Sequence, residues 1–147
     1  MHPCMDELTY TSPSSGGLRG LFSIAVDRTH TVLLVVFSDR LQVQDIADLD
    51  RLIRPIAPTG ALEKVIVDMR QVTMIDVPLE QWVERASAEP VLPGRQLMFV
   101  AADGSILRFC RQYAAYRERE GHDEIAIVPD LESAWRVFGM EAPTFGY

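Results

Sequence analysis

Two short polar segments of the chain have the residue types of a binding site. Residues 70–76 and 102–105 each follow an apolar, strand-like run and precede a helical pattern. In open α/β sheets, ligands bind beyond the carboxyl ends of the strands, so both segments are expected at that edge. Helices starting at Val77 and Ser105 would present unpaired N–H groups to a small anion. The candidate partner- or ligand-binding residues are Arg70, Thr73, Asp76, Val77, Asp103, Gly104, Ser105 and Arg108.

The same residue types also suit a structural role. Asp76, Asp103 and Ser105 belong to the side chains that cap helix N-termini, and capping alone would explain them. The helix expected after Ser105 is locally basic and could meet an acidic partner or lipid headgroups, or its charges could form a solvated outer face. Those basic residues are Arg108, Arg111, Arg117 and Arg119, interleaved with Glu118 and Glu120.

The titratable residues do not form a catalytic or metal-binding pattern. His2, His30 and His122 are far apart in the sequence, and no nucleophile or carboxylate lies at a motif spacing from them. Cys4 and Cys110 lack a partner thiol or histidine at zinc-site spacing. Cys110 also falls on an apolar stripe, where burial raises the thiol pKa and removes reactivity. We therefore expect a protein that is not an enzyme and uses no cofactor or metal.

Composition indicates one globular domain. The 147 residues are 48% hydrophobic and 24% charged, enough apolar material for a self-sufficient core. The formal net charge of −7 would repel phosphate backbones, which argues against nucleic acid as a partner. Residues 1–7 lack the features of a signal peptide and no apolar run approaches bilayer length, so we expect a cytoplasmic protein without integral membrane association.

The elements that would position the two polar segments alternate along the chain. Residues 1–20 are typical of a flexible leader and 141–147 of a tail, leaving one domain over 21–140. Strand-like runs are followed by helical apolar spacings that begin after Arg40, Asp76, Asp103 or Ser105, and Asp130. The order ββαβαβαβα predicts an α/β fold with a mostly parallel sheet and four helices. The expected strands are residues 21–26, 31–37, 64–69, 96–101 and 124–128.

This element order occurs together with a distinctive segment, Lys64-Val65-Ile66-Val67-Asp68-Met69-Arg70-Gln71-Val72-Thr73-Met74-Ile75-Asp76. The combination resembles the SpoIIAA-like branch of the STAS superfamily, whose founding members are anti-sigma-factor antagonists. The likeness spans roughly 21–140, and Asp68, Val72, Ile75 and Asp76 occupy positions of the family pattern. It implies a mixed sheet of about five strands, the first antiparallel, with helices on its faces.

One position departs from that family. The classical antagonist changes partners when the serine after the aspartate is phosphorylated, and here Val77 occupies that position. Valine has no hydroxyl, so a phosphorylation switch would need another acceptor such as Thr73. Pro78 also replaces a small residue. The resemblance therefore points to a SpoIIAA-like subgroup that lacks the phosphorylatable serine.

Two functions follow as hypotheses, and a third alternative, an enzyme of unknown reaction, would need a convergent set of polar groups that the sequence does not show. The first is a regulatory interaction module whose face around Asp76 binds a partner protein, with a homodimer through exposed helix faces or the tail as one arrangement. The second is binding of a lipid or other apolar small molecule between helices and sheet, since the SpoIIAA-like fold resembles Sec14-type lipid carriers. The aromatic residues at helical spacings would line such a pocket or simply fill a core, and only an internal cavity would support the pocket. They are Trp82, Phe109, Tyr116 and Trp135.

Overall fold

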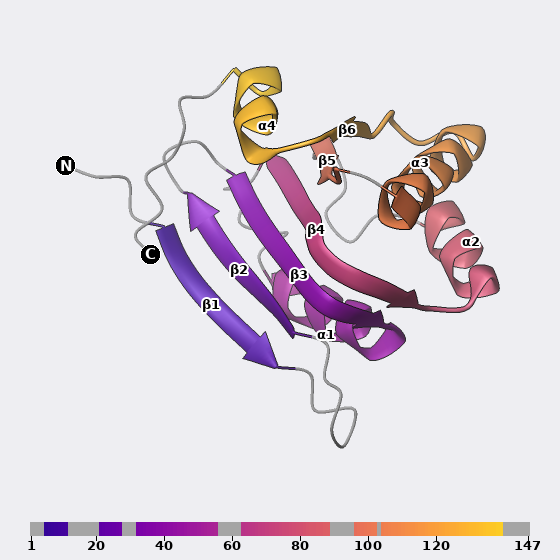
Figure 1. Cartoon of the computed structure of the whole chain (residues 1–147), viewed down its shortest axis with the longest axis horizontal. Coiled ribbons are helices and arrows are strands. Elements are labelled where there is room, and N and C mark those ends of the chain that lie inside the picture. Colours follow the sequence, from indigo (N-terminus) through magenta and orange to yellow (C-terminus); the bar gives the residue numbers. More distant parts are fainter. Residues whose placement is uncertain are drawn as a thin grey trace.

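In the part of the chain that the structure describes, six strands form one mixed sheet in which spatial order follows sequence order (Figure 1). The computed structural model describes residues 5–11, 21–27, 32–55, 63–88, 96–102 and 104–139. β1, β2 and β3 pair antiparallel, whereas β3, β4, β5 and β6 pair parallel. The predicted α/β fold with a mixed sheet is confirmed. The strands are β1 (Met5–Thr11), β2 (Leu21–Asp27), β3 (Val32–Gln42), β4 (Lys64–Asp76), β5 (Gln96–Val100) and β6 (Ala126–Val128).

β1 lies inside the segment predicted to be a flexible leader. Met5–Thr11 pairs with β2 along its whole length, with Met5 opposite Asp27. The leader prediction is therefore wrong for residues 5–11, and the sheet has one strand more than expected. The leader was predicted from the Ser, Gly and Pro residues at 12–17. The segment before them, Leu8-Thr9-Tyr10, includes good strand formers. Residues 1–4, 12–20 and the tail lie outside the described residues.

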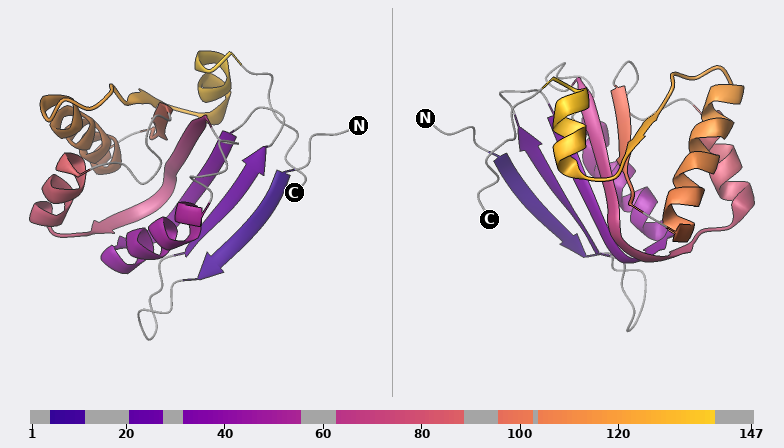
Figure 2. Two further views of the ribbon diagram at one scale, coloured as in Figure 1. Left: turned by 180° about the vertical axis from the view of Figure 1, so that it is seen from behind. Right: turned by 45° about the horizontal axis from the view of Figure 1, so that its top comes forward.

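Four helices cover the two faces of the sheet unequally. α1, α2 and α3 pack on one face and α4 on the other, as Figure 2 shows for α1 and α4. Side chains alternate along the strands, so Leu33 and Val35 of β3 enter the first core while Val32 and Leu34 enter the second. Burial on both faces explains the continuous apolar sequence of these strands. The helices are α1 (Val43–Ile53), α2 (Leu79–Ser87), α3 (Gly104–Arg119) and α4 (Leu131–Val137).

β4 is much longer than the strand predicted at 64–69. It continues to Asp76 because β3 also continues, and the two remain paired until Gln42 lies beside Asp76. Two register shifts interrupt this outer half, and Asp39 between them has a φ of 58°. The Thr73 hydroxyl donates to the Asp39 carbonyl at 3.1 Å and helps to hold this bulge. Residues 70–76 are therefore strand, and the prediction of a loop there is wrong.

α2 begins differently from the prediction. Asp76 ends β4 and forms an ion pair with Arg40 of β3, so its carboxylate does not cap α2. The N-cap is Pro78, whose carbonyl accepts the N–H groups of Gln81 at 3.0 Å and Trp82 at 3.3 Å. Asp76 thus precedes the N-cap residue, and its carboxylate is held by Arg40.

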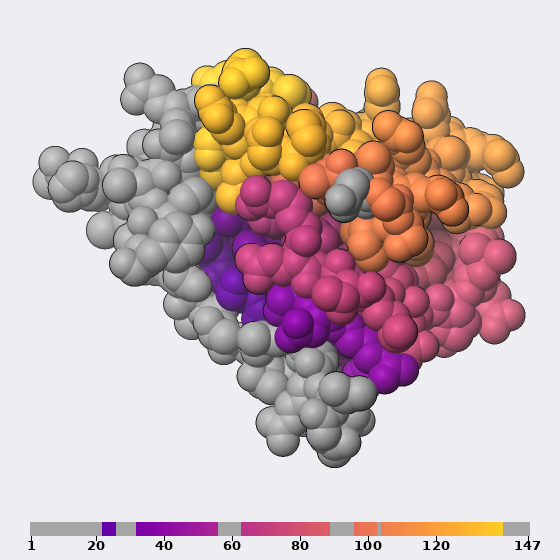
Figure 3. All heavy atoms as spheres, in the orientation of Figure 1, coloured from indigo at the N-terminus to yellow at the C-terminus, as the bar shows by residue number. Residues whose placement is uncertain are grey.

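α4 begins as predicted. Asp130 is its N-cap and accepts the Ser133 backbone N–H at 2.7 Å. That backbone hydrogen bond holds the pKa of Asp130 below its ordinary value. Trp135 is buried and Phe138 is partly buried beneath Lys64, whose ammonium lies 5.6 Å from the ring centroid. Figure 3 shows α4 seated beside β4 on this face.

Substitutions at buried and exposed positions near the second core should differ in their effect on the free energy of unfolding. Ile66 is fully buried near the start of β4, in the core that α4 covers, whereas Val137 is 59% exposed. Ile66→Ala should lower the free energy of unfolding by about 2 to 5 kcal/mol through lost burial and a cavity. Val137→Ala should change it by less than about 0.5 kcal/mol. Urea denaturation of both variants checks this, and equal effects would mean that α4 does not cover the sheet.

Candidate functional site

A cavity of about 590 Å³ lies between the sheet and the three helices on its first face. Its floor is apolar and comes from β3, β4 and β5. α1 forms one wall, and α2 with α3 forms the other. The main apolar residues are Val35, Phe37, Val67, Met69 and Phe99 from the sheet, Ile46, Leu49 and Ile53 from α1, and Trp82, Phe109 and Tyr113 from α2 and α3.

The cavity exists because the helix layer is divided. α1 packs on β3, while α2 packs on α3 and α3 packs on β4. One ion pair crosses the division: the Arg85 guanidinium donates to both carboxylate oxygens of Asp50, at 2.7 and 2.8 Å. A bidentate pair of this kind fixes geometry as well as charge. It holds α2 at a set distance from α1.

The electrostatics of Arg85 reflect this pairing. Burial alone would lower its pKa, but the hydrogen bond and charge of Asp50 outweigh burial, with a smaller contribution from the Tyr113 hydroxyl. The pKa of Arg85 is therefore raised above its ordinary value, and its charge is matched within the protein.

The polar residues of the cavity gather at its rim. They come from the C-terminal ends of α1 and α2 and from the connection between α3 and β6, at the end of the sheet where β4, β5 and β6 begin. The His122 ring lies 3.4 Å from the Ser87 carbonyl, which links this connection to α2. The remaining rim residues are Arg54, Glu84, Asp123 and Glu124, whereas Gln81 lines the cavity from the first turn of α2.

Arg117 differs from the other charged residues of α3. Arg108, Arg111 and Arg119 are exposed as a solvated face would be, but Arg117 is only 8% exposed and lines the cavity. Its side chain has no ion pair or hydrogen bond with the described residues, and its Nε is buried. Placing Arg117 on the outer face is therefore wrong. Arg117 is followed by the charged residues Glu118 and Arg119, so the sequence alone does not show that it is buried. Only the packing of α3 shows which arginine points inward.

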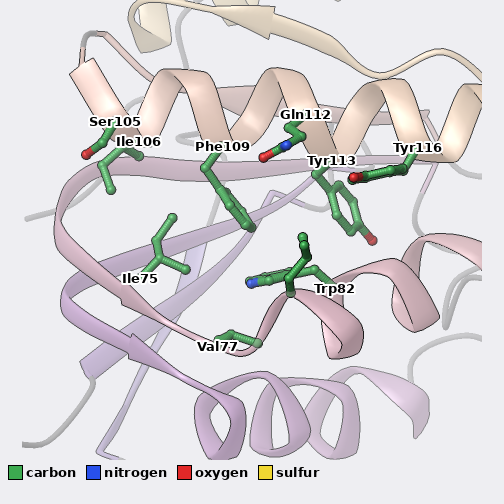
Figure 4. Close-up of a pocket in the computed structure, with 10 residues that line it drawn as sticks. Ile75, Val77, Trp82, Ser105, Ile106, Phe109, Gln112, Tyr113 and Tyr116 are labelled. Atoms are coloured by element: carbon green, nitrogen blue, oxygen red, sulfur yellow. The ribbon is translucent and has the colours of Figure 1, made fainter.

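A second, smaller hollow of about 250 Å³ lies where α2 and α3 begin (Figure 4). This groove brings together Val77 and Ser105, two of the residues predicted from sequence. Figure 4 shows Ile106 and Phe109 of α3 pointing across it toward Ile75 and Trp82. The other lining residues are Leu79, Gln112, Tyr113 and Tyr116.

An aromatic wall, Trp82, Phe109 and Tyr113, separates the groove from the cavity and lines both. The Trp82 ring centroid lies 4.5 Å from that of Phe109 and 5.4 Å from that of Tyr113, both in edge-on geometry. Trp82 is 8% exposed, and its Nε1 has no hydrogen-bond partner in the described part of the chain. A buried indole N–H usually has one, so this donor is available to a bound molecule.

The other predicted site residues do not converge. Arg70 donates to the buried carboxylate of Asp68 through Nε at 3.0 Å and Nη2 at 2.8 Å, on the face opposite the cavity. Thr73 holds the bulge and Asp76 pairs with Arg40, as described above. Gly104 is the first residue of α3, with a φ of 63° that favours glycine, and Arg108 is exposed. Asp103 lies outside the described residues.

Two aspartates of α1 are buried, which the sequence pattern did not reveal. Asp45 accepts the Gln42 backbone N–H at 2.8 Å at the helix start. Asp48 accepts Gln44 Nε2 at 2.8 Å and Arg51 Nη2 at 3.0 Å. Their partners give them a structural role, so neither is assigned to the site.

No protein-family model and no curated protein sequence matches this chain. The SpoIIAA-like resemblance remains a prediction. Among the described residues, no three side chains of His, Cys, Asp or Glu come together as metal ligands would. None of the described helices has both the length and the apolar character needed to cross a bilayer.

Cys110 is fully buried in the first core, and burial raises its pKa from 9.0 to about 12. In a Cys4→Ser background, iodoacetamide at pH 8 should therefore label Cys110 slowly in the folded protein and rapidly in 6 M guanidinium chloride, as mass spectrometry would show. The protonated thiol favours the folded state, so its stabilising contribution is complete below pH 9.0 and is lost as pH rises toward about 12. Equal labelling rates in both states would place Cys110 outside the core.

Proposed function

We propose that this protein binds an apolar or amphipathic small molecule in the cavity between the sheet and helices α1, α2 and α3, and that binding rather than catalysis is its function. The cavity itself is the observation that supports the proposal. Protein interiors are close-packed, and few contain voids much larger than a water molecule. A hollow of about 590 Å³ is within the size range of small-molecule sites.

The walls support the same proposal. Aliphatic and aromatic side chains form the floor and both sides, while the polar groups are confined to one rim. Ligand pockets have this division, in which apolar surface supplies affinity and a few polar groups set orientation. The Asp50–Arg85 pair keeps the walls apart in the empty protein, which reduces the cost of opening the site on binding.

The two tryptophans provide internal reporters of binding. Trp82 lines the cavity and Trp135 lies on the opposite face of the sheet. In Trp135→Phe protein, linear alcohols from 1-hexanol to 1-decanol should perturb Trp82 fluorescence. The affinity should rise about fourfold per methylene, since each buried methylene contributes about 0.8 kcal/mol. In Trp82→Phe protein, Trp135 should not respond. An affinity independent of chain length would contradict the proposal.

A variant that fills the cavity, compared with a matched variant at an exposed position, tests where the alcohol binds. Ile46 projects into the cavity from α1, whereas Leu52 of the same helix is 38% exposed and does not line it. Ile46→Trp should weaken 1-decanol binding by about tenfold or more in calorimetric titration, because the indole occupies ligand volume. Leu52→Trp should leave the affinity unchanged. Equal losses in both variants would place the alcohol elsewhere.

The partner-protein hypothesis is favoured by a different observation. Leu79 and Val83 of α2 are exposed by 61% and 36%, and Leu79 borders the groove. They are four residues apart on one helix and so lie on the same side of it, and neighbouring exposed apolar side chains are characteristic of interaction surfaces. They follow Asp76 in the chain, the residue around which the sequence predicts a partner to bind.

This surface can be tested separately from the cavity. Leu79→Asp should remove a co-purifying protein from the native mass spectrum of material isolated gently from its own host, because it introduces a charge into an apolar contact. The affinity for 1-decanol should stay unchanged, since Leu79 does not line the cavity. A partner retained by Leu79→Asp would exclude this surface.

A further inference from the structure

Arg117 is a buried charged side chain that lines the cavity from near the C-terminal end of α3, next to the polar rim. It is 8% exposed, its Nε is buried, and its side chain has no hydrogen bond or ion pair in the described part of the chain. A guanidinium stays protonated in proteins, so burial cannot be relieved by loss of the proton. An unpaired buried charge is unfavourable, and folded proteins normally pair it. A molecule bound in the cavity could therefore supply the partner that Arg117 lacks.

The neighbouring charges leave Arg117 as the available cation. Arg85 is held by both oxygens of Asp50, so its charge is already balanced. Arg54 is exposed at the rim. The acidic rim residues Glu84, Asp123 and Glu124 are exposed as well, and none of them pairs with Arg117.

We infer that the ligand of this cavity is an amphipathic monocarboxylate, with its apolar chain against the sheet and its carboxylate on Arg117. This inference rests on the proposed binding function and specifies the ligand class. The planar guanidinium matches a carboxylate through two parallel hydrogen bonds. One unpaired cation balances one negative charge, whereas a multiply charged phosphate would face the acidic rim and a net charge of −7.

The test compares ligands of equal chain length in the intact protein. Calorimetric titration at pH 7.5 should show that decanoate binds about 10- to 100-fold more tightly than 1-decanol, the usual gain from hydrogen bonds to a charged group. Decylamine should bind more weakly than 1-decanol, because its ammonium would meet a like charge. Equal affinities for decanoate and 1-decanol would overturn the inference while leaving the proposed binding function intact. If wild-type protein binds neither compound, both proposals fail.

Variants of Arg117 locate the carboxylate. Arg117→Met keeps an unbranched side chain without charge, and it should reduce decanoate binding to the level of 1-decanol while changing 1-decanol affinity little. Arg117→Lys should retain a preference for decanoate, because the charge remains. Arg111→Met, at an exposed position of the same helix, should change neither affinity. A decanoate preference that survives in Arg117→Met would overturn the assignment.

Thermal unfolding separates ligand binding from a structural role. Without ligand, Arg117→Met should have a melting temperature equal to or above that of wild type, since it removes an uncompensated buried charge. Decanoate should raise the melting temperature of wild-type protein more than that of the variant. A lower melting temperature in the empty variant, with parallel losses for decanoate and 1-decanol, would mean that Arg117 only supports the fold. The preference of wild-type protein for decanoate remains decisive if Arg117→Met does not fold.

Discussion

The parallel pairing of β3 with β4 determines where the helices of this domain can lie. The two strands stay together from Val32 and Lys64 to Gln42 and Asp76, well beyond the point where β5 ends its pairing with β4. α1 and α2 therefore leave the sheet from the same distant edge and run back over the same face. α1 remains against β3, while α2 joins α3. The helix layer divides along this line, and the cavity lies in the division.

Charge is distributed along that division in two distinct ways. Asp50 and Arg85 satisfy each other across it, which gives a fixed spacing with no free charge. Arg117, one helix away, has the same guanidinium but no carboxylate within the described residues. On an exposed surface, the energetic difference between a paired and an unpaired arginine would be small, because water and salt screen ion pairs between exposed side chains. At a largely buried position the difference is larger, since a buried charge without a partner is unfavourable. Burial and pairing, rather than residue type, therefore distinguish Arg85 from Arg117.

The order of strands and helices could be predicted because local apolar patterns specify it. Continuous runs such as 64–69 indicate strands covered on both faces, and Asp130 marks a helix start that the structure confirms. The extension of β4 could not be predicted, because residues 70–76 are polar except at Val72, Met74 and Ile75 and depend on β3 as a partner. β1 was missed for a similar reason, since only its pairing with β2 identifies Met5–Thr11 as a strand.

The candidate site was predictable only in part. Helical spacing predicted that Trp82 and Phe109 would line a pocket or fill the core, and both pack in the first core and line the cavity. Tyr116 lines the groove instead, and Trp135 packs in the second core. The rule that ligands bind at the carboxyl ends of strands predicted a site at the end of the sheet where the groove lies. The polar rim of the cavity lies at the opposite end of the sheet. Asp50, Arg85 and Arg117 come from three helices, and their convergence is set by tertiary packing that no local pattern encodes.

The aromatic wall connects the two hollows physically. Trp82, Phe109 and Tyr113 line both the cavity and the groove, and the Trp82 ring contacts each of the other two rings edge-on. Because packed side chains transmit displacement to their neighbours, an occupant of the cavity that moves Trp82 also changes the floor of the groove. The apolar surface around Leu79 begins at that groove. The cavity and the groove therefore share the Trp82 indole ring as part of their lining.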